Sequence, residues 1–212
     1  MSRRLPVYLL IDTSGSMSGE PIEAVKNGLQ MLVSALRQDP YALETAYLSV
    51  VTFDSNANVL VPLTELTAFQ PPDFNASGTT ALGEGLAKVA ECVSRDLVKT
   101  TPTTKGDWRP MLFLLTDGAP TDDWQKGLAR FKQEKWGTVV ACGVDGADDS
   151  VLKQITECVV NLTASDSSSL KAFFKWISAS VSQGSKSVEQ AGKEVSGLGE
   201  LPPPPAEIQI VT

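Results

Sequence analysis

Segments rich in aliphatic and aromatic residues alternate along this chain with amphipathic segments, which predicts alternating strands and helices. The run over residues 5–11 is apolar at every position and stops at Asp12. Such runs are typical of central strands that are covered on both faces. The predicted strands of this general kind are 5–11, 45–54, 109–118, 138–144 and 157–163.

Between these strands, hydrophobic residues recur at helical spacing. The first helix is predicted to begin near Pro21, with Glu20 and Glu23 at its positive end, and to end at Asp39–Pro40. Further helices are predicted around residues 82–93, 121–136, 149–156 and 168–181. Asp122 and Asp123 are expected to charge the first turn of the helix over 121–136.

The order of these elements predicts the fold class. Strands that alternate with helices imply right-handed crossovers and a mostly parallel sheet with helices on both faces, a Rossmann-like doubly wound α/β fold. The strand over 57–66 follows its predecessor after two residues, which predicts a hairpin, and Pro62 favours an edge position. One antiparallel edge strand is therefore expected.

The composition changes near Gln183, which predicts a domain over residues 1–182 and a Pro-rich tail over 183–212. Four consecutive prolines, 202–205, suit neither a helix nor a central strand and indicate a polyproline-type spacer. Two interpretations of the following 207–211 segment stay open. It is either part of a disordered tail or a strand that adds to an exposed sheet edge, in this molecule or another.

Composition removes several classes of function. The formal net charge is −7, which argues against nucleic acid as the main partner. The chain has no histidine, so histidine can serve neither as a catalytic residue nor as a metal ligand. The three cysteines lack paired spacing and indicate a reducing compartment. No segment has the ~20 apolar residues of a membrane span, and the N-terminal apolar run is shorter than most signal sequences, so a cytoplasmic location is expected.

Polar residues gather where two predicted strands end. Asp12 and Asp117 would emerge at the same edge of a parallel sheet, where ligands bind in such folds. A third loop brings Thr79 and Thr80 to that edge. Taken singly, these features are also typical of helix caps and turns, with Gly118 supplying a positive φ. Together they provide two carboxylates and several hydroxyls.

That set of oxygen donors favours a hard divalent cation, chiefly Mg²⁺, with Mn²⁺ or Ca²⁺ as alternatives. Asp12, Ser14 and Ser16 are two residues apart, so in an extended exit from the strand they can face one ion, while Gly15 lets the backbone turn. An ion held partly through water would accept one more anionic oxygen. A partner protein's Asp or Glu would supply it.

The segments "DTSGS", "SGTTALGEGL" and "LLTDG", in this order, resemble the metal-ion-dependent adhesion site (MIDAS) of von Willebrand factor A (VWA) domains. The resemblance covers roughly residues 5–182 and implies a non-catalytic, Mg²⁺-dependent protein-interaction module. The metal ligands that it implies are Asp12, Ser14, Ser16, Thr80 and Asp117. Thr79 stands where the family usually has a second glycine, which leaves the choice between the two threonines open.

Finer features, among them "LSVVTFDS" and "LKAFFKWIS", resemble the bacterial TerY proteins of the tellurium-resistance group. That resemblance implies an adaptor in a tellurite or stress response, with a protein kinase and a PP2C-type phosphatase as partners. Residues expected at the rim of the site are Gly15, Asp54, Thr79 and Gly118. Asp54 is equally well explained as a turn residue, and Trp108 and Trp124 are expected to anchor the core.

Two other functions stay in view. One is a Mg²⁺-dependent phosphotransferase or phosphatase that uses Asp12 as its nucleophile, although position 14 is Ser where an Asp-x-Asp site would need a second acid. The other is an interaction domain whose metal site is vestigial.

Overall fold

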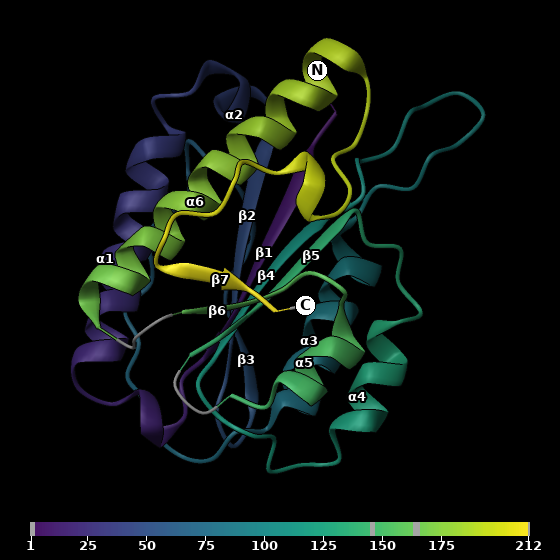
Figure 1. Ribbon diagram of the computed structural model, residues 1–212. Coiled ribbons are helices and arrows are strands. Elements are labelled where there is room, and N and C mark those ends of the chain that lie inside the picture. The colour runs from purple at the N-terminus through teal and green to yellow at the C-terminus, as the bar shows by residue number, and fades with distance from the viewer. Residues whose placement is uncertain (1–2, 145–146, 163–165, 212) are drawn as a thin grey trace.

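A mixed sheet with the strand order β3-β2-β1-β4-β5-β6-β7 forms the centre of the computed structural model (Figure 1). The structure describes residues 3–144, 147–162 and 166–211. Strands β2, β1, β4, β5 and β6 run parallel, whereas β3 and β7 lie antiparallel at the two edges. The strands are β1 (Leu5–Asp12), β2 (Ala46–Phe53), β3 (Ala57–Glu65), β4 (Met111–Thr116), β5 (Thr138–Gly143), β6 (Val159–Leu162) and β7 (Ile208–Ile210).

The doubly wound fold predicted from the sequence is confirmed, with the β2–β3 hairpin at one edge. Pro62 lies in that edge strand, where its missing N–H breaks no central ladder. The second antiparallel strand, β7, adds to the single one that was expected. Residue 163, the last of the predicted strand over 157–163, lies outside the described residues.

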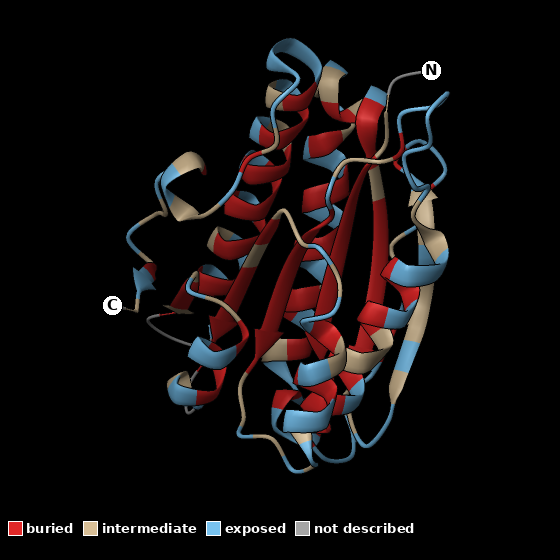
Figure 2. Ribbon diagram, turned by 90° about the vertical axis from the view of Figure 1, so that its right-hand side faces the viewer, coloured by how far each residue is buried: buried red, intermediate tan, exposed pale blue. Residues whose placement is uncertain are grey.

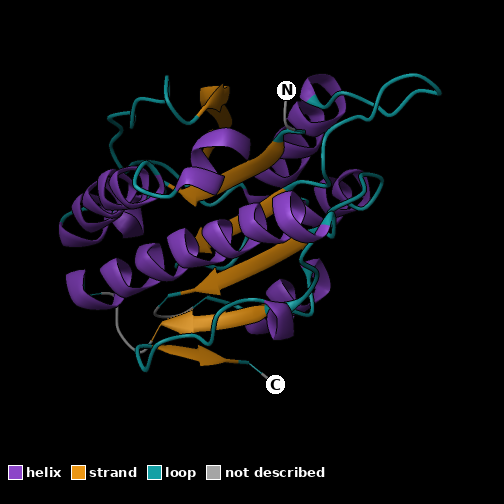
Figure 3. Cartoon of the chain, turned by 90° about the horizontal axis from the view of Figure 1, so that it is seen from above, coloured by secondary structure: helices purple, strands orange, loops and turns teal. Residues whose placement is uncertain are grey.

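Helices cover both faces of the sheet (Figure 3). One core cluster joins α1 and α6 to one face, and a second joins α3, α4 and α5 to the other. The helices are α1 (Glu20–Leu36), α2 (Pro40–Thr45), α3 (Leu82–Asp96), α4 (Trp124–Phe131), α5 (Asp149–Ile155) and α6 (Ser167–Lys186), with short turns η1 (Gly15–Met17), η2 (Ser187–Ala191) and η3 (Leu198–Glu200). Within the described ranges, no helix is both long and apolar enough to cross a membrane.

Strand β1 is buried along its whole length, which explains its uninterrupted apolar sequence (Figure 2). Leu9 and Ile11 belong to the core cluster under α1 and α6, whereas Tyr8 and Leu10 belong to the cluster under α3 and α4. Alternate residues therefore serve opposite faces, as the period of a strand requires. Trp108 and Trp124 are half-buried and pack against these clusters, as expected.

The short helix α2 was not predicted. Asp39 and Pro40 were expected only to end the first helix, which stops at Leu36. Instead, the Asp39 carboxylate accepts hydrogen bonds from the N–H groups of Tyr41 and Ala42, and Pro40 occupies the first turn. An N-cap followed by proline is a helix start signal, so this pair begins an element as well as following one.

The C-terminal segment packs against the rest of the chain. Helix α6 continues to Lys186, past the predicted boundary at residue 182, and the segment then crosses in front of α6 (Figure 1). Leu201 and Ile208 are buried in the core cluster on that face. The indole Nε1 of Trp176 donates to the Pro202 carbonyl at 2.8 Å. Of the two interpretations of residues 207–211, the structure has the strand, paired with β6 of the same molecule.

Strand β7 provides a matched test of this packing, because Ile208 is 5% exposed and Ile210 is 48% exposed. We expect Ile208→Ala to lower the free energy of unfolding by about 2 to 4 kcal/mol, since it leaves a cavity in the core. Ile210→Ala should cost less than about 1 kcal/mol. Urea denaturation measures both changes. Equal losses would contradict the packing of β7, and so would a loss near zero for Ile208→Ala.

Candidate metal centre

The edge of the sheet at the carboxyl ends of β1 and β4 brings the predicted site residues together. Strand β2 pairs with β1 on one side, and β4, the next parallel strand along the chain, pairs with β1 on its other side. This reversal of strand order is where doubly wound folds open a crevice for ligands. Register pairs Ile11 with Leu115, so Asp12 and Thr116 are the next residues along the two strands, and Asp117 follows.

The Asp12 carboxylate is fully buried and hydrogen-bonded through both oxygens. The backbone N–H of Ser14 donates to Oδ1 at 2.8 Å, and the Thr116 hydroxyl donates to Oδ2 at 2.6 Å. Burial raises the pKa of Asp12 above its ordinary value, and the nearby Asp117 carboxylate adds to this rise. The hydrogen bonds from Ser14 and Thr116 oppose it. The two carboxylates therefore form a repulsive pair that a cation between them would relieve.

Ser14 and Ser16 connect Asp12 to Asp117. The Oγ atoms of Ser14 and Ser16 lie 3.0 Å apart, and the Ser16 hydroxyl donates to Asp117 Oδ1 at 2.8 Å. Ser14 is buried, Asp117 is half-buried and Ser16 is exposed, so this line of oxygens runs from the core to the surface. The extended exit expected from the sequence holds only as far as Ser14, because Gly15–Met17 form the 3₁₀ turn η1.

The two glycines at the rim allow close approach rather than an unusual backbone conformation. The N–H of Gly15 donates to the Gly78 carbonyl at 3.1 Å, and a Cβ at Gly15 would lie 3.3 Å from that oxygen. A Cβ at Gly118 would lie 3.3 Å from the Thr80 hydroxyl oxygen. The prediction that Gly118 has a positive φ is wrong. Gly78, in the third loop, has a positive φ of 74°.

The adjacent threonines Thr79 and Thr80 face different surroundings. Thr80 is buried and lies against Gly118, the residue after Asp117. Its backbone N–H donates to the Thr121 hydroxyl, and its carbonyl accepts the N–H of Thr121, so the loop is held in place. Thr79 is exposed, and its hydroxyl bonds to the Ser55 Oγ at 3.2 Å. Thr80 is thus the threonine that the fold brings against Gly118, the residue that follows Asp117.

Asp54 serves the β2–β3 turn in this structure. One of its carboxylate oxygens accepts the Asn56 N–H at 3.0 Å, and its own N–H donates to the Asn56 carbonyl. Its backbone carbonyl accepts the N–H of Ala81, which ties this turn to the loop that carries Thr80. These contacts agree with the interpretation of Asp54 as a turn residue.

The sequence did not predict the hydrogen bonds that three polar residues near the site make. Thr116 holds the Asp12 carboxylate, and Thr121 holds the Thr80 loop. Asp122 accepts hydrogen bonds from the N–H groups of Gly83 and Glu84, so it caps α3 rather than charging its own helix. A threonine at the end of a buried strand is a weak sequence signal, and the contact of Asp122 with α3 depends on tertiary structure.

This collection of side chains suits a hard cation. Nowhere in the described residues do three or more His, Cys, Asp or Glu side chains gather as a metal-binding cluster. A cation at this edge would therefore be held by the two carboxylates and by neutral hydroxyl oxygens, the donor type that Mg²⁺, Mn²⁺ and Ca²⁺ accept. The predicted ligands Asp12, Ser14, Ser16, Thr80 and Asp117 carry oxygens of this type on three loops.

The fold and this edge define a doubly wound α/β domain with oxygen donors at the switch point of its sheet. The chain belongs to the von Willebrand factor type A domain family, whose sequence model matches residues 7–176.

An uncharacterized protein of Synechocystis sp. is 33% identical over 123 residues, which are 55% of this chain and 26% of that protein. A von Willebrand factor type A structure from Catenulispora acidiphila superimposes with a TM-score of 0.63 at 19% identity, over 85% of this chain and 43% of that one.

Proximal thread matrix protein 1 from the mussel byssus, solved with a zinc-occupied MIDAS motif, gives a TM-score of 0.60 at 22% identity over 84% of this chain and 48% of that one. The chain thus spans about a quarter of the Synechocystis protein and less than half of either solved chain.

The buried charge of Asp12 generates a prediction about stability. A raised pKa in the folded state means that the ionised carboxylate costs stability at neutral pH, and that this cost disappears as the pH falls through that raised pKa. In buffer with chelator at neutral pH, we expect Asp12→Asn to be at least as stable as the parent, because an amide can accept from Ser14 and donate to Thr116. Urea denaturation at neutral and mildly acidic pH measures this, and the difference should shrink in acid.

Asp107→Asn is the matched control. Asp107 is bonded to the guanidinium of Arg4 through both carboxylate oxygens, so the same chemical change there removes a balanced charge. We expect it to cost about 1 to 3 kcal/mol at neutral pH. If Asp12→Asn destabilises the metal-free protein as much as Asp107→Asn, the Asp12 carboxylate is not a net cost.

Proposed function

We propose that this chain is a non-catalytic protein-interaction module that holds a divalent cation, chiefly Mg²⁺, at the carboxyl edge of its sheet. Asp12, Ser14, Ser16, Thr80 and Asp117 would hold the ion, and an acidic side chain of a protein partner would complete its coordination. The observation that carries this proposal is the continuous line of contacts from buried Asp12 through Ser14 and Ser16 to Asp117.

Three further observations support the proposal. VWA domains commonly serve as protein-interaction modules, and this chain belongs to that family. The mussel byssus relative in fold has a zinc-occupied MIDAS motif. Burial and the negative charge of Asp117 raise the pKa of Asp12, and a bound cation would offset this cost of ionisation. The exposed Ser16 leaves the outer side of the site open to a partner.

The contacts of Asp12 disfavour the phosphotransferase alternative. A nucleophilic carboxylate must present an oxygen to its substrate, but Asp12 is fully buried and both of its oxygens accept hydrogen bonds. A cation can be held by Asp12 through a bridging water, whereas nucleophilic attack needs direct contact between a carboxylate oxygen and the substrate.

We further propose that the module acts as a cytoplasmic adaptor in a bacterial tellurite or stress-response assembly, with a protein kinase and a PP2C-type phosphatase as partners. The resemblance of the sequence to TerY proteins supports this part of the proposal. The free state of Cys92, Cys142 and Cys158 fits a reducing compartment.

The first test is cation-dependent binding. We expect Mg²⁺ to raise the melting temperature of the parent protein and to give a saturable calorimetric signal, because an ion bound by the folded state alone stabilises it by about 2.7 kcal/mol at a hundredfold excess over Kd. Asp12→Asn should abolish both effects. Partner proteins captured from a bacterial extract in Mg²⁺ should be lost in EDTA and with this variant.

Asp54→Asn is the control for that test, since Asp54 ends the neighbouring strand and an amide oxygen can still accept the N–H of Asn56. It should bind Mg²⁺ and partners like the parent. Mg²⁺ binding without partner capture would leave a metal site without the proposed function. Absence of Mg²⁺ and Mn²⁺ binding at millimolar concentration would favour the vestigial-site alternative.

The second test separates the two adjacent threonines. We expect Thr80→Ala to weaken Mg²⁺ binding by about tenfold, a change of about 1.4 kcal/mol, because it removes a hydroxyl that lies against Gly118, the residue after Asp117. Thr79→Ala, at the exposed neighbour that contacts Ser55, should change the affinity by less than about twofold. Isothermal titration calorimetry measures both. The opposite ranking would assign the ligand to Thr79.

A further inference from the structure

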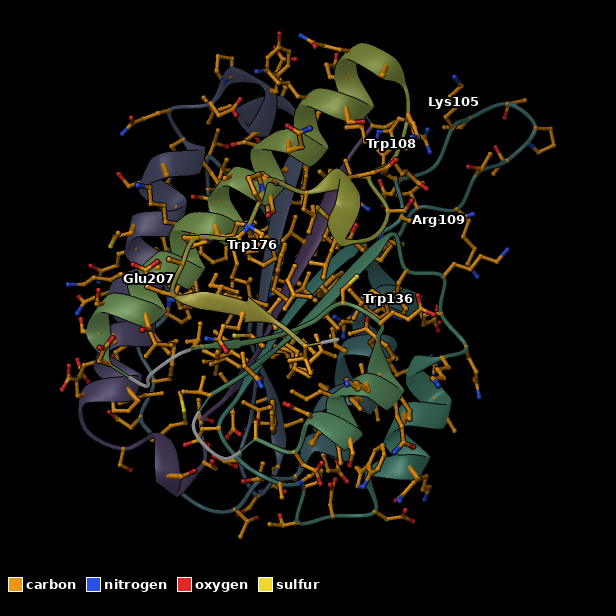
Figure 4. The ribbon with its side chains drawn as sticks, viewed as in Figure 1. Lys105, Trp108, Arg109, Trp136, Trp176 and Glu207 are labelled. Carbon is orange, nitrogen blue, oxygen red and sulfur yellow. The ribbon has the colours of Figure 1, made fainter. Side chains whose placement is uncertain are left out.

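A groove at the other end of the sheet has the features of a second binding surface. It lies between the loop over residues 97–108, which projects from the molecule before β4, and the segment 133–135 that follows α4 (Figure 1). Figure 4 places Lys105 on the projecting loop, with Trp108 and Arg109 at its base. The groove has a volume of about 530 Å³.

The wall of this groove is held by its own hydrogen bonds. The N–H of Asp107 donates to the Val98 carbonyl at 2.9 Å, and the N–H of Gly106 donates to the Thr100 hydroxyl at 3.0 Å. A Cβ at Gly106 would lie 2.3 Å from the Val98 carbonyl oxygen, so the two sides of the loop approach as closely as glycine permits. The loop is therefore a built feature, and a ligand would meet a surface that is already formed.

The acidic residues of the groove are neutralised from outside it, whereas its lysines are not. Asp107 is paired with Arg4 and Glu134 with Arg130, at 2.5 and 2.6 Å. Arg109 is paired with Glu194 of the C-terminal segment at 3.5 Å. Lys99 and Lys135 are exposed and form no ion pair with any residue that the structure describes. The groove thus carries a local positive charge on a chain whose net charge is −7.

Apolar surface accompanies this charge. Val98 is 52% exposed, which is unusual for a large hydrophobic side chain of this protein, and half-buried Leu97 and Trp108 lie in the same groove. The guanidinium of Arg3 lies 3.6 Å from the centroid of the Trp108 ring and holds that ring in place. Lysines beside exposed apolar groups are complementary to a segment with both acidic and apolar side chains.

We propose that this groove binds a short acidic peptide segment of a protein partner, with carboxylates beside Lys99 and Lys135 and an apolar side chain against Val98. A long polyanion fits less well, because it would extend over the negatively charged remainder of the surface, whereas a short segment experiences mainly the charges within about 8 Å. The groove lies at the amino end of β4, and Asp117 follows the carboxyl end, so this inference does not rest on the metal site.

Fluorescence polarisation tests the proposal with a fluorescein-labelled peptide that has glutamates on both sides of a central leucine. We expect the full chain to bind this peptide saturably. The double variant Lys99→Glu and Lys135→Glu should bind it with an affinity at least about tenfold lower. The double variant Lys171→Glu and Lys175→Glu changes the net charge equally on exposed lysines of α6, and it should bind within about twofold of the parent. EDTA should leave the affinity unchanged.

Equal weakening by the two double variants would overturn the proposal, because the effect would then be one of net charge. So would absence of saturable binding, loss of binding in EDTA, or equal affinity for a peptide with glutamines in place of the glutamates. Duplex DNA or phosphatidylserine vesicles that bind more tightly than the peptide, and release with the groove variant, would reassign the groove to a polyanion. Circular dichroism confirms that both double variants are folded.

Discussion

The buried carboxylate of Asp12 is the constraint on which the architecture of the site depends. A carboxylate in a fully covered position is costly unless its oxygens are paired, and here the Ser14 N–H and the Thr116 hydroxyl pair them. Those two donors come from the turn after β1 and from the end of β4, so the same contacts fix the course of the chain. The negative charge of the nearby Asp117 adds to the cost of ionising Asp12, and this cost is the physical basis of the proposed ion site.

The sheet makes this arrangement possible by its strand order. Residues more than a hundred positions apart in sequence, such as Asp12 and Thr116, become neighbours because β4 pairs with β1 rather than with β3. The third loop is attached to the same edge through backbone contacts of Gly15 with Gly78 and of Thr80 with Thr121. Rigid strands below and a bonded loop above leave the hydroxyl of exposed Ser16 at the surface, where a partner can approach.

The two ends of the sheet differ in chemistry. The carboxyl end gathers acidic and hydroxyl oxygens, whereas the amino end carries the projecting loop with its lysines and exposed Val98. The C-terminal segment joins α6 to the far edge strand through Trp176, Leu201 and Ile208, and its Glu194 pairs with Arg109 at the groove. The proposed metal site and the proposed peptide groove therefore lie at opposite ends of the sheet.

The sequence alone determined the class of fold and the elements that carry the candidate site. Continuous apolar runs that stop at Asp12 and Asp117 predict buried parallel strands with aspartates at one edge, because burial on both faces leaves no place for polar residues within such strands. The tertiary structure decided what depends on contacts between distant segments. These are the hydroxyl of Thr116 on Asp12, the capping of α3 by Asp122, the burial of Thr80 rather than Thr79, and the return of the C-terminal segment as β7. Each needs a neighbour that local periodicity does not identify, since periodicity reports only which face of an element is buried and not what covers it.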